Sequence, residues 1–197
     1  ADGFIVRVDE HGARIAAEGL GYTNECVVDP TRKYLYVNET FTRRVSRFKL
    51  DKNGTLSGQE TVTEFGPADF PDGLTFDSAG NLWVTCIISN RLIRVAPDGG
   101  QQVFLEDCDH ENMAIVEERY QAGCLQGADF DRVKPKVLRN ISSLAFGGPD
   151  LRTAWLGCLR GASLATFRSP SAGLIPAHFE VVPTWLDQLA SMPSSPS

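Results

Sequence analysis

The sequence lacks the features that would place it in a membrane or on a nucleic acid. It contains no run of about 18 apolar residues, the length that a membrane-spanning helix needs. It also has no block of lysines and arginines, and 19 basic residues against 25 acidic ones give a net charge of −6. We therefore expect neither a membrane protein nor a nucleic-acid-binding protein.

Several common catalytic and metal-binding motifs are absent as well. There is no GxSxG, P-loop, HExxH or EF-hand pattern, and the 3 histidines show no metal-ligand spacing. The 5 cysteines are odd in number and include no CxxC pair, which predicts neither a disulfide framework nor a zinc ribbon. Unpaired cysteines are typical of a reducing compartment, so we expect a cytoplasmic protein.

What the sequence does contain is a repeat of strand-like units. Each unit opens with a polar residue, a short apolar run and a turn, and the three openings are Asn24–Pro30, Asp72–Ser78 and Ser142–Gly148. Second strands follow at Tyr34–Val37, Leu82–Thr85 and Ala154–Gly157, and third strands at Arg44–Phe48, Arg91–Val95 and Ser163–Phe167. Fourth strands are expected at Glu60–Phe65 and Gln102–Leu105. Four strands in roughly 40–50 residues is the period of a β-propeller blade.

The number of units predicts an incomplete ring. The segments Phe4–Val8 and Ala13–Ala17 fit the last two strands of an earlier unit, so about three and a half blades are present. The sequence begins inside a blade and without methionine, and we therefore expect blades to precede it. We predict an all-β propeller domain over 1–182 and a frayed tail over 183–197.

An insertion at 107–140 delays the last unit. Within it, the apolar spacing predicts a helix near 110–122, with Met113, Val116 and Tyr120 on one face. Two interpretations of the insertion remain open: it is an ordinary surface segment, or it is a lid over the mouth of the propeller.

The repeat brings three polar residues to equivalent positions. The first strand of each blade lines the channel of a propeller, so Asn24, Asp72 and Ser142 are expected to meet near its axis. Their oxygen atoms suit Ca²⁺, Mg²⁺ or Mn²⁺ better than a metal that prefers sulfur or nitrogen. Asp72 and Asn24 could instead serve only a turn and a strand end. Glu39, at the end of a second strand, is a candidate substrate contact at the mouth.

These segments resemble a known family. The stretch 70–99, FPDGLTFDSAGNLWVTCIISNRLIRVAPDG, resembles the signature blade of the gluconolactonase / senescence marker protein (regucalcin) / luciferin-regenerating enzyme family. Residues 24–54 are similar to the preceding blade, and 142–148 to a late blade. The resemblance implies a six-bladed lactonase-type propeller with one divalent cation in its channel. Calcium is the first candidate, with zinc, magnesium and manganese as alternatives.

The resemblance also implies roles for particular residues. Asn24 and Asp72 match metal ligands of the family, and Asp72 matches its acid/base residue. The family's glutamate ligand lies in a blade that this sequence does not contain, and Glu25 stands where the family usually has glycine. Ser142 or Ser143 could position the substrate by hydrogen bonding.

We therefore expect a metal-dependent hydrolase of sugar-type lactones acting on a small molecule. The sequence leaves open the lactone, the metal and the oligomeric state. Two alternatives remain: a non-catalytic calcium- or ligand-binding propeller, and a strictosidine-synthase-like enzyme on the same blades.

Overall fold

The computed structural model describes residues 2–130, 132, 134 and 137–175. The tail predicted at 183–197 lies outside these residues, as does the end of the predicted domain.

The two strands of the N-terminal hairpin are β1 (Gly3–Asp9) and β2 (Gly12–Leu20). The next sheet consists of β3 (Thr23–Val28), β4 (Tyr34–Glu39), β5 (Arg44–Leu50) and β6 (Leu56–Glu64). It is followed by β7 (Pro71–Phe76), β8 (Leu82–Cys86), β9 (Arg91–Val95) and β10 (Gln101–Glu106). The remaining elements are α1 (His110–Gln121), α2 (Gly127–Phe130), β11 (Ile141–Gly147), β12 (Thr153–Cys158) and β13 (Ala165–Arg168).

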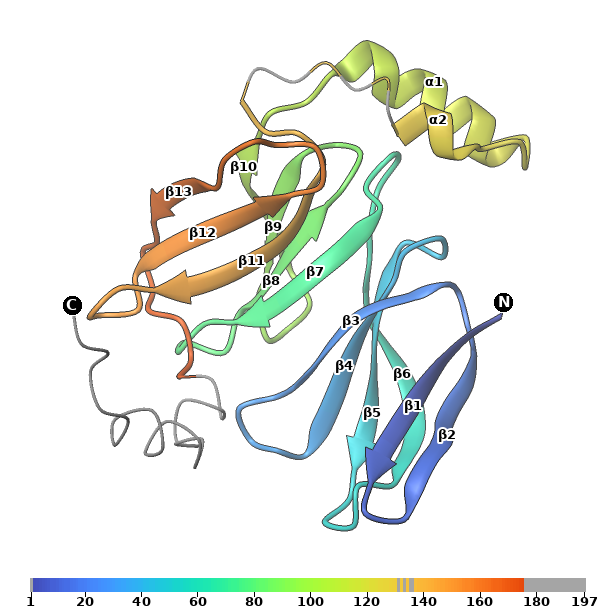
Figure 1. The fold of residues 1–197 in the computed structure, drawn as a ribbon, viewed down its shortest axis with the longest axis vertical. Coiled ribbons are helices and arrows are strands. Elements are labelled where there is room, and N and C mark those ends of the chain that lie inside the picture. Colours follow the sequence, from blue (N-terminus) through green and yellow to red (C-terminus); the bar gives the residue numbers. More distant parts are fainter. Residues whose placement is uncertain (1, 131, 133, 135–136, 176–197) are drawn as a thin grey trace, which may run out of the picture.

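The strands form antiparallel sheets that follow the order of the chain (Figure 1). The strand orders are β3-β4-β5-β6, β7-β8-β9-β10 and β11-β12-β13, and β1 pairs with β2 in a separate hairpin. Each sheet is a propeller blade whose first strand is innermost. The predicted repeat, its strand order and the helix of the insertion are thereby confirmed. The described part of the third blade contains three strands.

The middle blade, β7–β10, forms the best buried part of the molecule. All five residues of β8 are buried, in agreement with their nearly continuous apolar sequence. One side of the blade packs in a cluster with Val45 and Phe65 of the preceding blade. On the other side, Trp83 and Leu92 pack against β11 and β12. This blade therefore has a neighbour on both faces.

Aspartates shape the first turn of two successive blades. The Oδ1 atom of Asp29 accepts hydrogen bonds from the backbone N–H groups of Lys33 and Tyr34, both at 2.8 Å. The Oδ1 atom of Asp77 accepts in the same way from Ala79 and Asn81, both at 2.9 Å. Hydrogen bonds from backbone N–H groups to an aspartate side chain stabilise a tight turn. The two turns confirm that the blades repeat in conformation.

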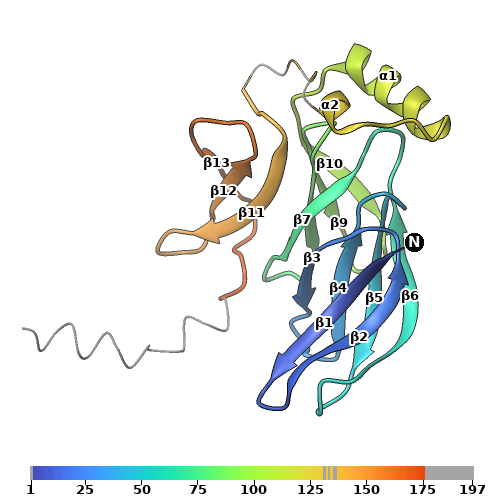
Figure 2. The same cartoon turned by 45° about the vertical axis from the view of Figure 1, so that its right-hand side comes forward.

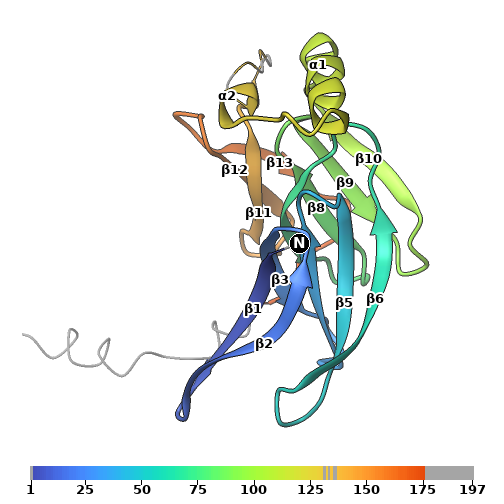
Figure 3. The ribbon, with the colours of Figure 1, turned by 90° about the vertical axis from the view of Figure 1, so that its right-hand side faces the viewer.

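The helices of the insertion cover one end of the sheets. In each of the three views, α1 and α2 lie beyond the same end of the blades (Figures 1, 2 and 3). α1 is capped by Asp109, whose side chain accepts from the Asn112 N–H. Its buried residues Met113 and Val116 pack on Phe70 and neighbouring apolar residues. No helix among the described residues is long and apolar enough to cross a membrane.

Candidate functional site

A β-bulge interrupts the innermost strand of every blade at the predicted site residue. The register shifts lie between Thr23 and Cys26, between Pro71 and Leu74, and between Ile141 and Ser143. The interrupted segments contain Asn24, Asp72 and Ser142. A bulge redirects side chains that regular pairing would place elsewhere, and bulges are common beside active sites.

The three bulges supply the floor of one cavity. This cavity has a volume of about 830 Å³, and Asn24, Asp72 and Ser142 all line it. Thr40, which follows β4, lines it beside them. The structure thus brings together the three side chains that the repeat placed at equivalent positions. Their roles in binding or catalysis remain predictions.

Side chains of the preceding blade hold the peptide on either side of Asp72. The Thr40 Oγ1 hydroxyl donates to the carbonyl oxygen of Pro71 at 2.7 Å. The Asn38 Nδ2 group donates to the carbonyl oxygen of Asp72 itself at 2.8 Å. Asn38 is fully buried and Thr40 nearly so. These two hydrogen bonds tie the peptides on either side of Asp72 to the preceding blade.

The next two peptides of β7 are held in the same manner. The Gly73 N–H donates to Thr85 Oγ1 at 3.0 Å, and the Leu74 N–H donates to Glu25 Oε2 at 2.9 Å. Glu25 is the residue that stands where the family usually has glycine. Its carboxylate therefore has a structural use here, since it links β3 to β7 directly beside the cavity.

Gly73 is required because β7 and β11 approach each other closely. A Cβ atom at this position would lie 2.5 Å from the Ser142 carbonyl oxygen and 2.7 Å from the Ser143 Cα atom. Both atoms belong to the backbone and cannot rotate away. Only glycine allows this approach, which brings the bulges of β7 and β11 to the same cavity.

Asp72 is a buried carboxylate without a cationic partner. Its residue is 8% exposed, and among the described residues it forms no ion pair. Burial raises its pKa to about 6, a hydrogen bond from the Asn24 side chain opposes this shift, and the nearby Glu25 charge adds to it. A charged group in such a place costs free energy unless a positive charge is bound beside it.

The donor set fits a hard divalent cation in part. The Asn24 amide oxygen and the Asp72 carboxylate are the oxygen ligands that such ions prefer, and both line the cavity. Within the described residues, no group of three or more histidine, cysteine or acidic side chains could hold a metal ion. These two residues thus account for part of a coordination shell.

Glu39 does not reach the mouth, which corrects the expectation of a substrate contact. Its side chain is fully buried, and its carboxylate accepts from Arg44 Nε and Nη2 at 2.8 and 2.9 Å. It also accepts from the Ser46 hydroxyl and, at 2.6 Å, from the Gly21 N–H. With its oxygens engaged, Glu39 ties neighbouring strands together inside the blade.

The structure also separates the two candidate serines. Ser142 lines the cavity, whereas the Ser143 hydroxyl lies over Gly157 of the next strand, where a Cβ atom would be 2.2 Å from it. Ser143 is not among the described residues that line the cavity. Ser142 is the one that stays a candidate for substrate positioning.

The insertion adds wall residues that the sequence did not indicate as site residues. Tyr120 of α1, Phe130 of α2 and Leu125 between them line the same cavity. The predicted helix placed Tyr120 on one face with Met113 and Val116, and that shared face was the available signal. The sequence could not show which surface the helix would cover.

Comparisons with known proteins agree with the blades. Residues 1–106 match the SMP-30/Gluconolactonase/LRE-like region. The chain is 34% identical over 100 residues to the 6-deoxy-6-sulfogluconolactonase of Pseudomonas putida, covering 49% of this chain and 34% of that protein. It is 30% identical over 159 residues to a pentonolactonase of Haloferax volcanii, covering 79% and 45% of the two chains. The chain thus spans less than half the length of these relatives.

Solved structures show the same fold at low identity. A luciferin-regenerating enzyme superposes with a TM-score of 0.61 at 17% identity, covering 88% of this chain and 54% of that one. A calcium-binding protein, regucalcin, from Agrobacterium tumefaciens gives a TM-score of 0.61 at 16% identity, with coverage of 87% and 54%. The sheets are therefore part of a six-bladed propeller of this type. With more than half of its residues matched by the family, the chain belongs to the SMP-30/gluconolactonase/LRE-like proteins.

Proposed function

We propose that this protein is a metal-dependent hydrolase of sugar-type lactones and that Asp72 is its acid/base residue. The observation that carries the proposal is the buried Asp72 carboxylate, which lies at a bulge, lines the cavity beside Asn24 and has no cationic partner among the described residues. Membership of the family and relatives named as lactonases support this reaction.

Asn24 and Asp72 are the residues that would hold the cation. Calcium is the first candidate, because the donors are oxygen atoms and because one protein of the same fold is described as calcium-binding. Zinc, magnesium and manganese remain the alternatives. When bound, such an ion would polarise the carbonyl group of the lactone.

Asp72 would move the proton in the reaction. In its ionised form the carboxylate accepts a proton from the attacking water, and it then returns that proton to the ring oxygen that leaves. The hydrogen bonds to Pro71, Gly73 and the Asp72 carbonyl fix the peptide that carries this side chain. The half-buried Ser142 hydroxyl faces the same cavity and would orient the lactone ring.

The test is lactone hydrolysis by the purified protein with calcium present, using a panel of aldonolactones. Asp72→Asn keeps the size of the side chain and removes the base, so kcat is expected to fall about 100-fold or more. Ser143→Ala is the matched control, because Ser143 lies outside the cavity, and it should retain activity. Equal activity of the wild type and Asp72→Asn would contradict the proposal.

A non-catalytic calcium-binding protein is the second candidate, favoured by the calcium-binding description of the Agrobacterium protein. Calorimetry with Ca²⁺ beside the same lactone panel separates the two functions. Calcium binding without hydrolysis of any lactone would support the binding protein and exclude the hydrolase.

A further inference from the structure

Residues of the insertion line the same cavity as the bulges. Tyr120, Leu125 and Phe130 of the insertion line the cavity together with Phe41 and Ile87 of the blades. We call these five residues the apolar wall. α1 and α2 lie beyond one end of the sheets (Figure 3).

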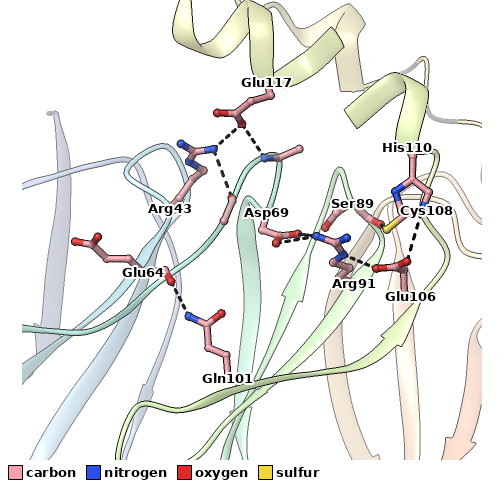
Figure 4. A network of polar contacts seen from close by, with 12 residues as sticks. Arg43, Glu64, Asp69, Ser89, Arg91, Gln101, Glu106, Cys108, His110 and Glu117 are labelled. Carbon is pink, nitrogen blue, oxygen red and sulfur yellow. Dashed lines mark hydrogen bonds and ion pairs between the residues drawn. The ribbon is translucent and has the colours of Figure 1, made fainter. Parts of the chain in front are cut away.

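The insertion is fixed in place by contacts with two blades. Arg43 Nη1 pairs with Glu117 Oε2 at 2.6 Å (Figure 4). The same oxygen accepts from the Ala68 N–H at 2.8 Å. The Arg43 guanidinium also lies 4.5 Å from the centre of the Tyr120 ring. Arg43 and Glu117 are 16% and 20% exposed, so this ion pair is largely shielded from water.

Aromatic rings of the insertion also pack against the blades. The Phe70 ring centroid lies 5.2 Å from that of Tyr120 and 6.4 Å from that of Phe130. Asn140 Nδ2, at the end of the insertion, donates to the carbonyl oxygens of Ile87 and Phe130 at 3.2 and 3.1 Å. The apolar wall is therefore a built part of the site.

The chemistry of the wall differs from that of the floor. The floor presents the amide, carboxylate and hydroxyl of Asn24, Asp72 and Ser142, whereas the wall presents rings and aliphatic groups. The Tyr120 hydroxyl donates to the Phe41 carbonyl oxygen, so its donor hydrogen is already used. Of the described side chains that line the cavity, Asp72 alone carries a charge at neutral pH, and none is lysine or arginine.

This division predicts an amphipathic ligand. A lactone ring can meet the polar floor, whereas hydroxyl groups against the five side chains of the apolar wall would lose water without gaining partners. An apolar group in that position would instead be buried favourably. Gln126 is the polar side chain that the insertion adds to the lining beside this wall. The volume of about 830 Å³ lies in the upper part of the range for pockets that enclose ligands larger than one small ring.

We propose that the preferred substrate is a lactone that carries an alkyl or aryl substituent, with the ring on the floor and the substituent against the apolar wall. The inference rests on the proposed lactone hydrolysis, but it replaces the sugar-type lactone of that proposal with a lactone whose substituent is apolar.

The experiment compares kcat/KM for a series of δ-lactones: the unsubstituted ring, rings with propyl, pentyl and phenyl groups, and glucono-δ-lactone. We expect kcat/KM to rise roughly threefold to fourfold for each added methylene group and to be at least tenfold higher for the pentyl lactone than for glucono-δ-lactone. Leu125→Asn should reduce kcat/KM for the pentyl lactone at least fivefold more than for the unsubstituted one.

Ile115→Asn is the matched control, because Ile115 is an exposed apolar residue of α1 that does not line this cavity. It should keep the preference for the pentyl lactone. Hydrolysis of glucono-δ-lactone as fast as the pentyl lactone, or an unchanged preference in Leu125→Asn, would overturn the inference and leave the lactonase proposal standing. Failure to hydrolyse any lactone of the series would overturn both.

Discussion

The strands β3 and β7 occupy the same place in successive blades, yet their surroundings differ. Five of the six residues of β7 are buried, whereas none of the six residues of β3 is. β7 contacts β3 and β4 on one side and β11 on the other, while β3 contacts β7 and, less extensively, β1. The burial of an innermost strand thus depends more on the blades packed on either side of it than on the residue types in the strand.

The same difference divides the candidate site. Asp72 on β7 is nearly buried, and the peptides around it are held by side chains of three strands and of the segment after β4. Asn24 on β3 is exposed, and its Nδ2 group lies 3.4 Å from Thr40 Oγ1. Among the described residues, the peptide that carries Asp72 therefore has more hydrogen-bond support than the side chain of Asn24.

The largest difference in the free energy of unfolding is expected between Leu74→Ala and Cys26→Ala. These variants change equivalent positions, two residues after Asp72 and Asn24. Leu74 is 2% exposed in the core between blades, so truncation leaves a cavity and should reduce the free energy of unfolding by about 3 kcal/mol. Cys26 is exposed, and its truncation should cost less than about 0.5 kcal/mol. Urea unfolding measures both values, and equal losses would show that the burial of β7 is unimportant.

The next contrast concerns the residues directly after Asp72 and Asn24. Gly73→Ala places a methyl group against backbone atoms of β11 and should cost about 2 kcal/mol and displace Asp72. Glu25→Ala removes the acceptor of the Leu74 N–H and should cost about 1 kcal/mol. The two variants are compared by urea unfolding and by lactone hydrolysis. Full activity in Gly73→Ala would contradict the requirement for close approach of β7 and β11.

The smallest difference in stability is expected between variants of the two turn aspartates, Asp77 and Asp29. Both lie well buried, and hydrogen bonds from their turns hold the pKa of each carboxyl below its usual value despite the opposing effect of burial. Asp77 also accepts from Trp83 Nε1 and from the Ser171 hydroxyl, a contact with the segment after β13. We expect Asp77→Asn to cost about 1.5 kcal/mol at pH 7 and Asp29→Asn about 1 kcal/mol.

The sign of their pH dependence follows from the lowered pKa values. Each ionised aspartate contributes stability above the pKa of the unfolded chain, near 3.8, and this contribution is lost as the pH falls through the lower folded pKa. Unfolding free energies measured between pH 6 and pH 3 should therefore decline less steeply in either Asn variant than in the wild type. Identical slopes in the wild type and Asp77→Asn would contradict this assignment.

The sequence could predict the blades and the convergence of three side chains because both follow from the repeat. Equivalent first-strand positions put Asn24, Asp72 and Ser142 around one axis, and the structure places all three on one cavity. The bulges could not be predicted, because one extra residue in a strand leaves no distinct pattern in the sequence. The expectation for Glu39 failed because its partners, Arg44 and Ser46, become neighbours only when β4 pairs with β5.

The insertion shows the other limit of sequence analysis. Apolar spacing predicted its helix closely, but the surface that the helix covers depends on contacts distant in the chain, such as Arg43 with Glu117. The wall residues could therefore be found only from the structure.

Calcium titration by calorimetry tests most directly whether Asn24 and Asp72 form the cation site at the centre of this account. The wild-type protein should bind one Ca²⁺, Asn24→Ala and Asp72→Asn should each weaken that binding at least tenfold, and Ser143→Ala should leave it unchanged. Equal affinity in all four proteins, or no binding of Ca²⁺, Mg²⁺, Mn²⁺ or Zn²⁺ by the wild type, would contradict the account.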